Sequence, residues 1–273
     1  MYRPVLVGGA ITKLDNGLQV GSYQRFTLYS AYQPIYRPTR SSALQLVGLE
    51  GLIRPYVDDV SLPPSLLYRE IEDIDRHGVE QMCQSLHVLN YWAAAPEACD
   101  LFLNVNLANY ASAELLERDL DALLGKLWIN GLSAQTLVLE IVETKPCCEA
   151  ILTALRNFAH ENHVRIAIDD FSKGFSDIER YEVLKPDLVK IDGQVFARGT
   201  SPARESHMLQ SIVSRVHGDG GKVVIEGIET PTMLAMALEL EADLLQGSYL
   251  DAPYTLPYDF SRHHFPMQSA IRH

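Results

Sequence analysis

The 273-residue sequence has no uninterrupted apolar run of about 18 residues, the length that a transmembrane helix needs. Its first residues, MYRPVLVGGAITKLDNG, also lack the apolar core and cleavage site of a secretory signal peptide. Cysteine is scarce, and no Cys-x-x-Cys pair or disulfide-scaffold spacing is present among Cys83, Cys99, Cys147 and Cys148. We therefore expect reduced thiols in a cytoplasmic protein without direct membrane contact, although a longer, membrane-anchored parent is compatible with the same features.

Positive charge is also in short supply. The chain has 23 lysines and arginines against 35 aspartates and glutamates, a formal net charge of -12 and a pI near 5.2. This balance argues against a binding surface for DNA or for an anionic membrane. An anionic substrate would need local cations, either metal ions or a few lysine and arginine side chains directed at it.

The sequence does contain an alternation of short strand-like segments with longer helical patterns. Strands are predicted at residues 31–36, 44–50, 101–106, 137–141, 164–169, 188–191, 223–226 and 244–247. Helical patterns lie in the gaps at 64–91, 113–127, 147–162, 203–217 and 230–240. Together with a hydrophobic fraction of 47%, this rhythm predicts an α/β fold, a TIM-like (β/α)8 barrel.

The first connection differs from the others, because only RPTRSSA separates the first two predicted strands. A crossover helix does not fit there, so we predict an antiparallel hairpin that brings Gln33, early in its strand, beside Glu50 at the end of the next. No internal repeat or linker-like tract divides the chain. We expect one barrel domain at 25–260, with an N-terminal extension at 1–24 and a C-terminal tail at 261–273.

Polar residues stand at the C-terminal ends of most predicted strands: Glu50, Asn106, Glu140, Asp169 with Asp170, Lys190, Glu226 and Gln246. In a βα barrel these ends converge on one face, where the active site is built. Each residue alone also fits an ordinary role as a helix cap, a solvated loop charge or half of a surface ion pair. Their common face is better explained by one shared site.

The adjacent carboxylates of Asp169 and Asp170 indicate a bound cation, because like charges in a half-buried setting repel each other. Carboxylate and amide oxygens favour Mg²⁺ or Mn²⁺, with Ca²⁺ as a substitute. Zinc fits less well, since none of the nine histidines lies at a predicted strand end. The donors exceed what one Mg²⁺ usually takes from protein, so we predict two ions about 3.5 to 4 Å apart that activate water and stabilise phosphate charge.

Eight segments occur in the order and approximate spacing of the EAL domain family, which the chain resembles from about Phe26 to Tyr258. They are YQPI at 32–35, EGLIR at 50–54, NVNLA at 104–108, LEIVE at 139–143, DDFSKGFSD at 169–177, KID at 190–192, EGIET at 226–230 and QGSYLDAP at 246–253.

The resemblance implies a barrel with an antiparallel first strand that hydrolyses cyclic di-GMP to linear pGpG in bacterial second-messenger signalling. It implies that two Mg²⁺ or Mn²⁺ ions are held by Glu50, Asn106, Glu140, Asp169, Asp170 and Glu226. Lys190 resembles the lysine that positions the attacking water, with Gln246 nearby. The same resemblance implies that Glu143 steadies the loop after Asp170 and that Glu229 supports the residues that hold the metal. The implied substrate contacts are Gln33, Leu52 and Arg54. The apolar character of Leu52 and Pro253 suits packing against purine faces, and it fits ordinary positions at the rim of the site equally well. A homodimer is also implied.

Two departures from the family pattern stand out. Gly51 replaces the alanine of the family name, and we expect little effect from it beyond extra backbone freedom. Ser172 and Lys173 replace the usual Gly-Thr after Asp-Asp-Phe, which alters the loop next to the proposed metal site. We favour an active metal-dependent phosphodiesterase; the alternatives are a catalytically silent cyclic di-GMP receptor and a regulatory interaction module.

Overall fold

The computed structural model describes residues 10–40, 43–91, 99–142, 148–171, 175–196 and 202–255. Its strands are β1 (Ile11–Lys13), β2 (Gln19–Tyr23), β3 (Phe26–Pro38), β4 (Leu44–Val57), β5 (Val60–Ser61), β6 (Asp100–Val105), β7 (Leu137–Ile141), β8 (Arg165–Ile168), β9 (Leu188–Asp192), β10 (Lys222–Glu226), β11 (Leu244–Leu245) and β12 (Tyr254–Thr255). Its α-helices are α1 (Pro64–Glu70), α2 (Arg76–Tyr91), α3 (Ala113–Ile129), α4 (Glu149–Asn162), α5 (Phe175–Leu184), α6 (Pro202–Gly218) and α7 (Pro231–Glu239). Glu143, Cys147, Ser172, Lys173 and the predicted tail at 261–273 lie outside the described residues.

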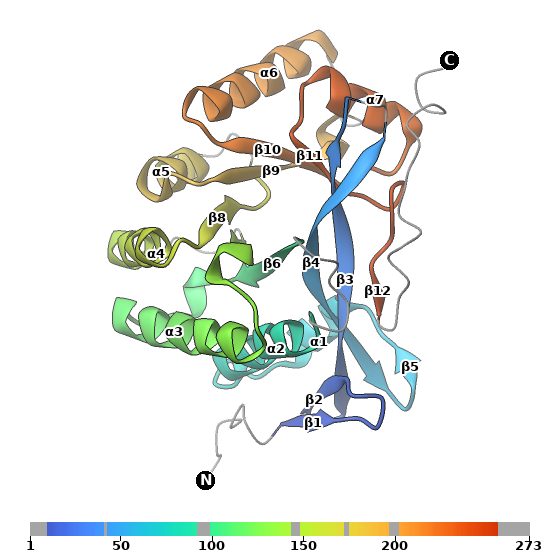
Figure 1. Cartoon of the computed structure of the whole chain (residues 1–273), viewed down its shortest axis with the longest axis vertical. Coiled ribbons are helices and arrows are strands. Elements are labelled where there is room, and N and C mark those ends of the chain that lie inside the picture. Colours follow the sequence, from blue (N-terminus) through green and yellow to red (C-terminus); the bar gives the residue numbers. More distant parts are fainter. Residues whose placement is uncertain are drawn as a thin grey trace.

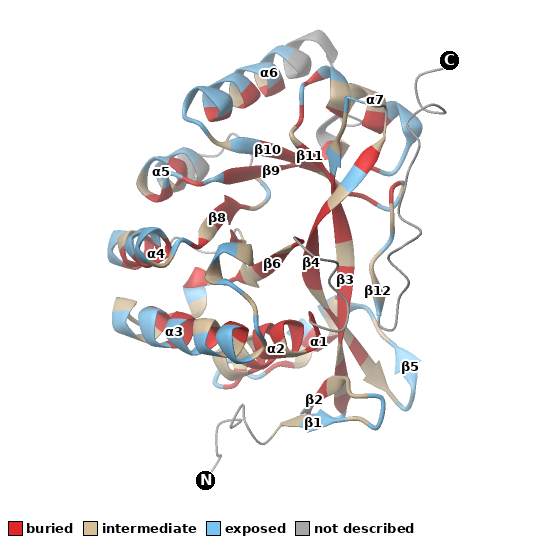
Figure 2. Ribbon diagram, in the orientation of Figure 1, coloured by how far each residue is buried: buried red, intermediate tan, exposed pale blue. Residues whose placement is uncertain are grey.

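The predicted barrel is confirmed. Strands β4, β6, β7, β8, β9, β10 and β11 pair in parallel around the sheet, and β3 closes it by pairing antiparallel with both β4 and β11. Helices α3 to α6 lie side by side along the outside of the strands (Figure 1). Their buried faces are turned toward the sheet and their exposed faces away from it (Figure 2).

The predicted hairpin is also confirmed, and Gln33 of β3 pairs directly with Glu50 of β4. Both strands are longer than predicted, so these two residues lie in mid-strand rather than near a strand end. The extra length runs beyond the barrel, where β2 pairs with β3 and β5 pairs with β4. Asn90 on α2 hydrogen-bonds to both the amide and the carbonyl of Gln19, which fastens β2 to the barrel.

The helices differ from the prediction in two places. The pattern at 64–91 divides into α1 and α2, because Ile71 ends α1 in an extended conformation with φ -67° and ψ 123°. Helix α5 has no counterpart among the predicted helices, since its 10 residues give only a short apolar pattern. Within the described part of the chain, no helix is long and apolar enough to cross a membrane.

The interior of the barrel is filled in layers. One buried apolar side chain from each barrel strand forms a common cluster: Ile35, Val47, Phe102, Val138, Ala167, Leu188, Val224 and Leu244. Side chains two positions apart on a strand point to the same side of the sheet. The next inward-facing position is therefore fixed for each strand by counting two residues from this cluster.

That count yields a polar layer. Moving two residues along the parallel strands beyond β4 gives Asn104, Glu140, Asp169, Lys190, Glu226 and Gln246. Strand β3 runs the other way, so its member, Gln33, lies two residues before Ile35. The pairing of β4 with β3 skips Val47, which forms a bulge. Because of this extra residue, the inward-facing residue of β4 at this level is Glu50, three positions after Val47 instead of two. We call these eight residues the polar layer.

Candidate active site

The centre of the polar layer is an ammonium group surrounded by carboxylates. Lys190 is 1% exposed, and its Nζ lies 2.8 Å from Glu226 Oε2, 3.4 Å from Glu50 Oε2 and 3.5 Å from Asp169 Oδ1, with Glu140 in closer contact. These acids come from four different strands, or from the residue directly after one. One buried positive charge therefore faces four acidic groups.

Glu50 is the most tightly held of the acids. Gln246 donates from Nε2 to Glu50 Oε2 at 2.7 Å, and Asn104 donates from Nδ2 to Glu50 Oε1 at 3.1 Å. Burial alone would raise the pKa of Glu50, but Lys190 and these two amide donors lower it below its usual value. Glu50 therefore remains an ionised acceptor at neutral pH.

Two of the other acids, Glu140 and Glu226, have raised pKa values. Burial, together with Glu50 and Asp169, raises the pKa of Glu140 well above its usual value, and burial raises the pKa of Glu226 to about 7. Burial would lower the pKa of Lys190, yet the surrounding carboxylates raise it well above its usual value. Four acids share one ammonium group, so a divalent cation among them would lower the pKa of Glu140 and of Glu226.

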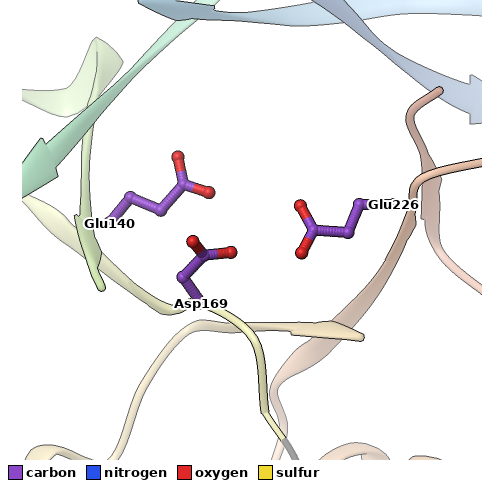
Figure 3. A group of neighbouring side chains, drawn as sticks. All are labelled: Glu140, Asp169 and Glu226. Carbon is purple, nitrogen blue, oxygen red and sulfur yellow. The ribbon is translucent and has the colours of Figure 1, made fainter. Parts of the chain in front are cut away.

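These donors fit a divalent cation. Glu140, Asp169 and Glu226 each offer an oxygen within 4.8 Å of the others, and their carboxylates point toward one another inside the ring of strands (Figure 3). Glu140 Oε2 and Gln246 Oε1 are buried acceptors with no hydrogen-bond partner in the structure. Buried oxygens of this kind are the ligands that Mg²⁺, Mn²⁺ and Ca²⁺ prefer.

Two of the predicted metal ligands lie at the edge of this group. Asp170 is exposed and has a left-handed backbone with φ 50°, and it is not among the three acids whose oxygens converge. Asn106 precedes the short 3-10 helix η2 (Leu107–Asn109), where its Oδ1 accepts a hydrogen bond from the amide of Ala108 at 3.1 Å. Their roles as ligands stay predictions.

The other predicted residues that the structure describes lie outside the group of acids around Lys190. Gln33 donates from Nε2 to the carbonyl of Asp251 at 3.3 Å, and the half-buried Pro253 follows two residues later in the chain. Glu229 is exposed on the loop before α7. Leu52 and Arg54 line a cavity of about 460 Å³ that also reaches both Asn104 and Asn106. The cavity that Arg54 lines therefore meets the polar layer at Asn104, which bonds to Glu50.

Glu80 lines the same cavity, and no sequence pattern singles it out. Burial raises its pKa from 4.5 to about 7, so folding favours the protonated form. The stability that this proton contributes is complete below pH 4.5 and is lost as the pH rises through about 7.

We therefore expect Glu80→Gln to raise the free energy of unfolding at pH 8 by about 1 to 3 kcal/mol relative to the unchanged chain. At pH 5 the gain should shrink below about 1 kcal/mol. Urea unfolding of both proteins at pH 5 and at pH 8, in the presence of a chelator, measures this difference in the free energy of unfolding. Glu117→Gln on the exposed face of α3 is the control. An equal gain for Glu80→Gln at both pH values would contradict the raised pKa of Glu80.

Gly51 is required by close packing, which corrects the expectation that it adds only backbone freedom. Its φ is not positive, but a Cβ at this position would lie 2.7 Å from Cγ of His87. His87 is buried, bonds through Nδ1 to Ser30 Oγ at 3.0 Å, and burial lowers its pKa to about 4. A neutral imidazole therefore occupies the space beside Gly51.

Gly51→Ala should accordingly lower the free energy of unfolding by about 1 to 3 kcal/mol, because the added methyl group displaces a packed ring. Removing the ring in Gly51→Ala/His87→Ala should cost less than the sum of the two single substitutions. Thermal or urea unfolding of the four proteins measures the coupling. Strict additivity would show that His87 is not the obstacle.

A second glycine fixes the position of Gln246. A Cβ on Gly247 would lie 2.2 Å from the carbonyl oxygen of Ile228, so no side chain fits there. The amide of Ile228 in turn donates to the carbonyl of Gln246 at 3.1 Å. This close approach of two backbone segments holds Gln246 over Glu50.

Comparison with known proteins identifies the family of this chain. The family model described as EAL domain matches residues 18–253. The chain belongs to the EAL domain family. This confirms the resemblance drawn from the eight sequence segments, and the match begins at residue 18, directly before β2, rather than at β3.

Relatives of this EAL domain are longer proteins. It is 28% identical over 247 residues to the probable cyclic di-GMP phosphodiesterase PdeN of Escherichia coli, covering 88% of the chain and 46% of PdeN. It is 28% identical over 233 residues to the cyclic di-GMP phosphodiesterase NbdA of Pseudomonas aeruginosa, covering 82% of the chain and 29% of NbdA. The chain thus spans less than half the length of either relative.

Solved EAL structures share the fold. Bacillus subtilis YkuI, in complex with cyclic di-GMP and calcium, matches with a TM-score of 0.73 at 24% identity, covering 89% of this chain and 60% of YkuI. Klebsiella pneumoniae BlrP1, in a manganese and cyclic di-GMP complex, matches with a TM-score of 0.71 at 20% identity, covering 89% of this chain and 58% of BlrP1. The EAL barrel of this chain is therefore a shared architecture.

Proposed function

We propose that this EAL domain hydrolyses one phosphodiester bond of cyclic di-GMP and releases linear pGpG, with two Mg²⁺ or Mn²⁺ ions as cofactors. The observation that carries the proposal is the buried group of Glu50, Glu140, Asp169 and Glu226 around Lys190, with acceptors that lack donors. Such a centre beside an arginine-lined cavity suits an anionic phosphate substrate.

The proposed role of each residue follows from its charge. The four acids would hold the ions, which when bound would activate water and neutralise negative charge on the phosphate. Arg54 presents a planar fork of donors to a phosphate oxygen, while Lys190 supplies a compact positive charge next to the reacting group. Water adds to phosphorus, one bond from phosphorus to a ribose oxygen breaks, and that oxygen takes up a proton.

The relatives support the same substrate. PdeN and NbdA are named for cyclic di-GMP phosphodiesterase activity. YkuI and BlrP1 were solved with cyclic di-GMP together with calcium or manganese. Those metals agree with the oxygen donors of this chain, which has carboxylates and amides in its polar layer and no histidine there.

A silent receptor for cyclic di-GMP is the second candidate. Asp170 is exposed and apart from the three convergent acids, and the loop after it carries Ser172 and Lys173 in place of the usual Gly-Thr. A receptor needs the arginine-lined cavity but no reactive metal centre. Tight binding without product formation would favour this function over hydrolysis.

We also propose a homodimer that forms over helices α5 and α6. An apolar groove of about 310 Å³ lies between them, lined by Phe171, Ile178, Tyr181, Met208 and Ile212 among others, and Ile178 is 46% exposed. A second copy would cover this surface. Analytical ultracentrifugation of the chain and of Ile178→Asp tests it: the substitution should weaken self-association, and a monomer at all concentrations would refute it.

Hydrolysis is tested by incubating purified, metal-stripped protein with cyclic di-GMP and added Mg²⁺ or Mn²⁺, followed by chromatography of the nucleotides. We expect pGpG to accumulate only with metal. Unchanged cyclic di-GMP at protein concentrations that bind it would reject the enzyme and leave the receptor.

A further inference from the structure

We infer that Asp251 is a positioning residue for nucleotide recognition: anchored by Tyr36, it turns the side-chain amide of Gln33 so that the amide oxygen, and not the nitrogen, faces the substrate. The inference rests on the proposed function, in which the nucleotide lies against the polar layer. Neither Tyr36 nor Asp251 is among the predicted site residues. Both lie where β3 and the last strands of the barrel meet.

The barrel closes through one backbone pair. Strands β3 and β11 share a single register pair, Tyr36 with Leu245, and β12 pairs with β3 further along that strand (Figure 1). The hydroxyl of Tyr36, which is 1% exposed, donates to Oδ2 of Asp251. This bond ties the segment between β11 and β12 to β3 through side chains.

The backbone of Asp251 is held as well as its side chain. Its amide donates to the carbonyl of Gly247 at 3.0 Å, in a tight turn directly after Gln246. Its carbonyl oxygen can only accept a hydrogen bond, and the donor is Nε2 of Gln33 at 3.3 Å. Of the two ends of the Gln33 amide, the nitrogen therefore faces Asp251, and the oxygen is left for another partner.

The amide oxygen of Gln33 is placed for a ligand of the acidic centre. Gln33 belongs to the polar layer and pairs in register with Glu50, one of the acids around Lys190. Within the described part of the chain, no donor bonds to Gln33 Oε1. A nucleotide held at the acids therefore meets an acceptor here, which calls for a donor on the nucleotide.

An acceptor selects among purine bases by the donors that they carry. Guanine presents N1–H and a 2-amino group side by side, whereas adenine has an acceptor at N1 and no 2-amino group. A site built to bond a donor rejects an analogue without it, because the acceptor of the site then stays unpaired. Gln33 in this orientation favours guanine, and Asp251 sets that preference through Gln33.

Tyr36→Phe tests the anchor, because it removes the hydroxyl and leaves the ring packed. We expect it to weaken binding of cyclic di-GMP by about 3- to 10-fold, the effect of one lost hydrogen bond. Calorimetry with Ca²⁺ in place of Mg²⁺ measures the affinity, and chromatography confirms that the nucleotide stays intact. Tyr32→Phe is the matched control on the same strand, since its buried hydroxyl donates instead to the carbonyl of His87 at 2.8 Å. Its affinity for cyclic di-GMP should not change.

A double-mutant cycle shows whether Tyr36 and Asp251 act through Gln33. Asp251→Ala should match Tyr36→Phe, because it removes the other half of the same bond. Gln33→Ala should itself weaken binding, and Tyr36→Phe should then have little further effect. The preference for cyclic di-GMP over cyclic di-AMP, measured by competition, should fall in Tyr36→Phe and stay unchanged in Tyr32→Phe. A loss of stability alone does not produce that difference.

Unchanged affinity for cyclic di-GMP in Tyr36→Phe, or an equal loss in the Gln33→Ala background, would overturn the inference, even where cyclic di-AMP does not compete at all. A chain that binds cyclic di-GMP but releases no pGpG would defeat the proposed hydrolysis and leave the role of Asp251 intact. A chain that binds no cyclic di-GMP would overturn the inference together with the proposed substrate.

Discussion

Lys190→Met should lower the free energy of unfolding of the metal-free protein by about 3 to 5 kcal/mol, and a divalent cation should restore a large part of that loss. Lys190 is 1% exposed and is the positive charge that Glu50, Glu140, Asp169 and Glu226 share. Removing it leaves buried carboxylates without a counter-ion, which a bound metal replaces.

Urea unfolding in a chelator and in excess Mn²⁺ measures both parts of this result. Lys185→Met is the matched control, because Lys185 is an exposed lysine paired with Glu182 at 2.7 Å. Its loss should stay within about 1 kcal/mol in either condition. An equal loss for Lys190→Met with and without Mn²⁺ would mean that the ammonium and the metal do not serve the same acids.

Glu50→Ala and Asp169→Ala should each reduce hydrolysis of cyclic di-GMP by about a thousandfold or more. Glu50→Ala removes the acceptor of Asn104 and Gln246 and one of the acids around Lys190. Asp169→Ala removes one of the three carboxylates whose oxygens lie within 4.8 Å of one another. Both changes take away an acid that the proposed ions need.

Initial rates of pGpG formation at saturating substrate and metal measure the effect. Glu117→Ala, on the exposed face of α3, should retain full activity. Metal affinity of the two variants should fall in parallel with the rate. A Glu50→Ala protein with near-normal turnover would contradict the role of the polar layer.

The sequence was sufficient to predict the barrel because its strands and crossover helices follow simple periods. The short RPTRSSA connection also fixed the antiparallel hairpin, and from it the pairing of Gln33 with Glu50. The extension of β3 and β4 beyond the barrel was not predictable in the same way. It depends on pairing with β2 and β5, and such partners leave no period in the sequence of β3 itself.

The acids of the site were predictable as strand-end residues, but their level inside the barrel was not. Glu50 and Lys190 lie within their strands, and their place in one layer follows from the bulge at Val47 and the stagger between strands. A usable signal was present: each polar residue lies two positions from an inward apolar one. That count finds Asn104, which a pattern centred on Asn106 passes over.

Packing around Gly51 shows a second limit of structure prediction from the sequence. A single small residue in a strand does not reveal which side chain approaches it, and His87 comes from a helix 36 positions later. The reason for the glycine lies in a contact between distant segments. Only coordinates supply that contact.

The most direct test of the central claim is to count the Mn²⁺ ions that one chain binds, by equilibrium dialysis of the metal-stripped protein with cyclic di-GMP present. The account predicts two ions per chain, lost in a Glu140→Gln/Asp169→Asn variant. Binding that the variant retains in full, or no bound Mn²⁺ at all, would show that the acids around Lys190 do not form a metal centre.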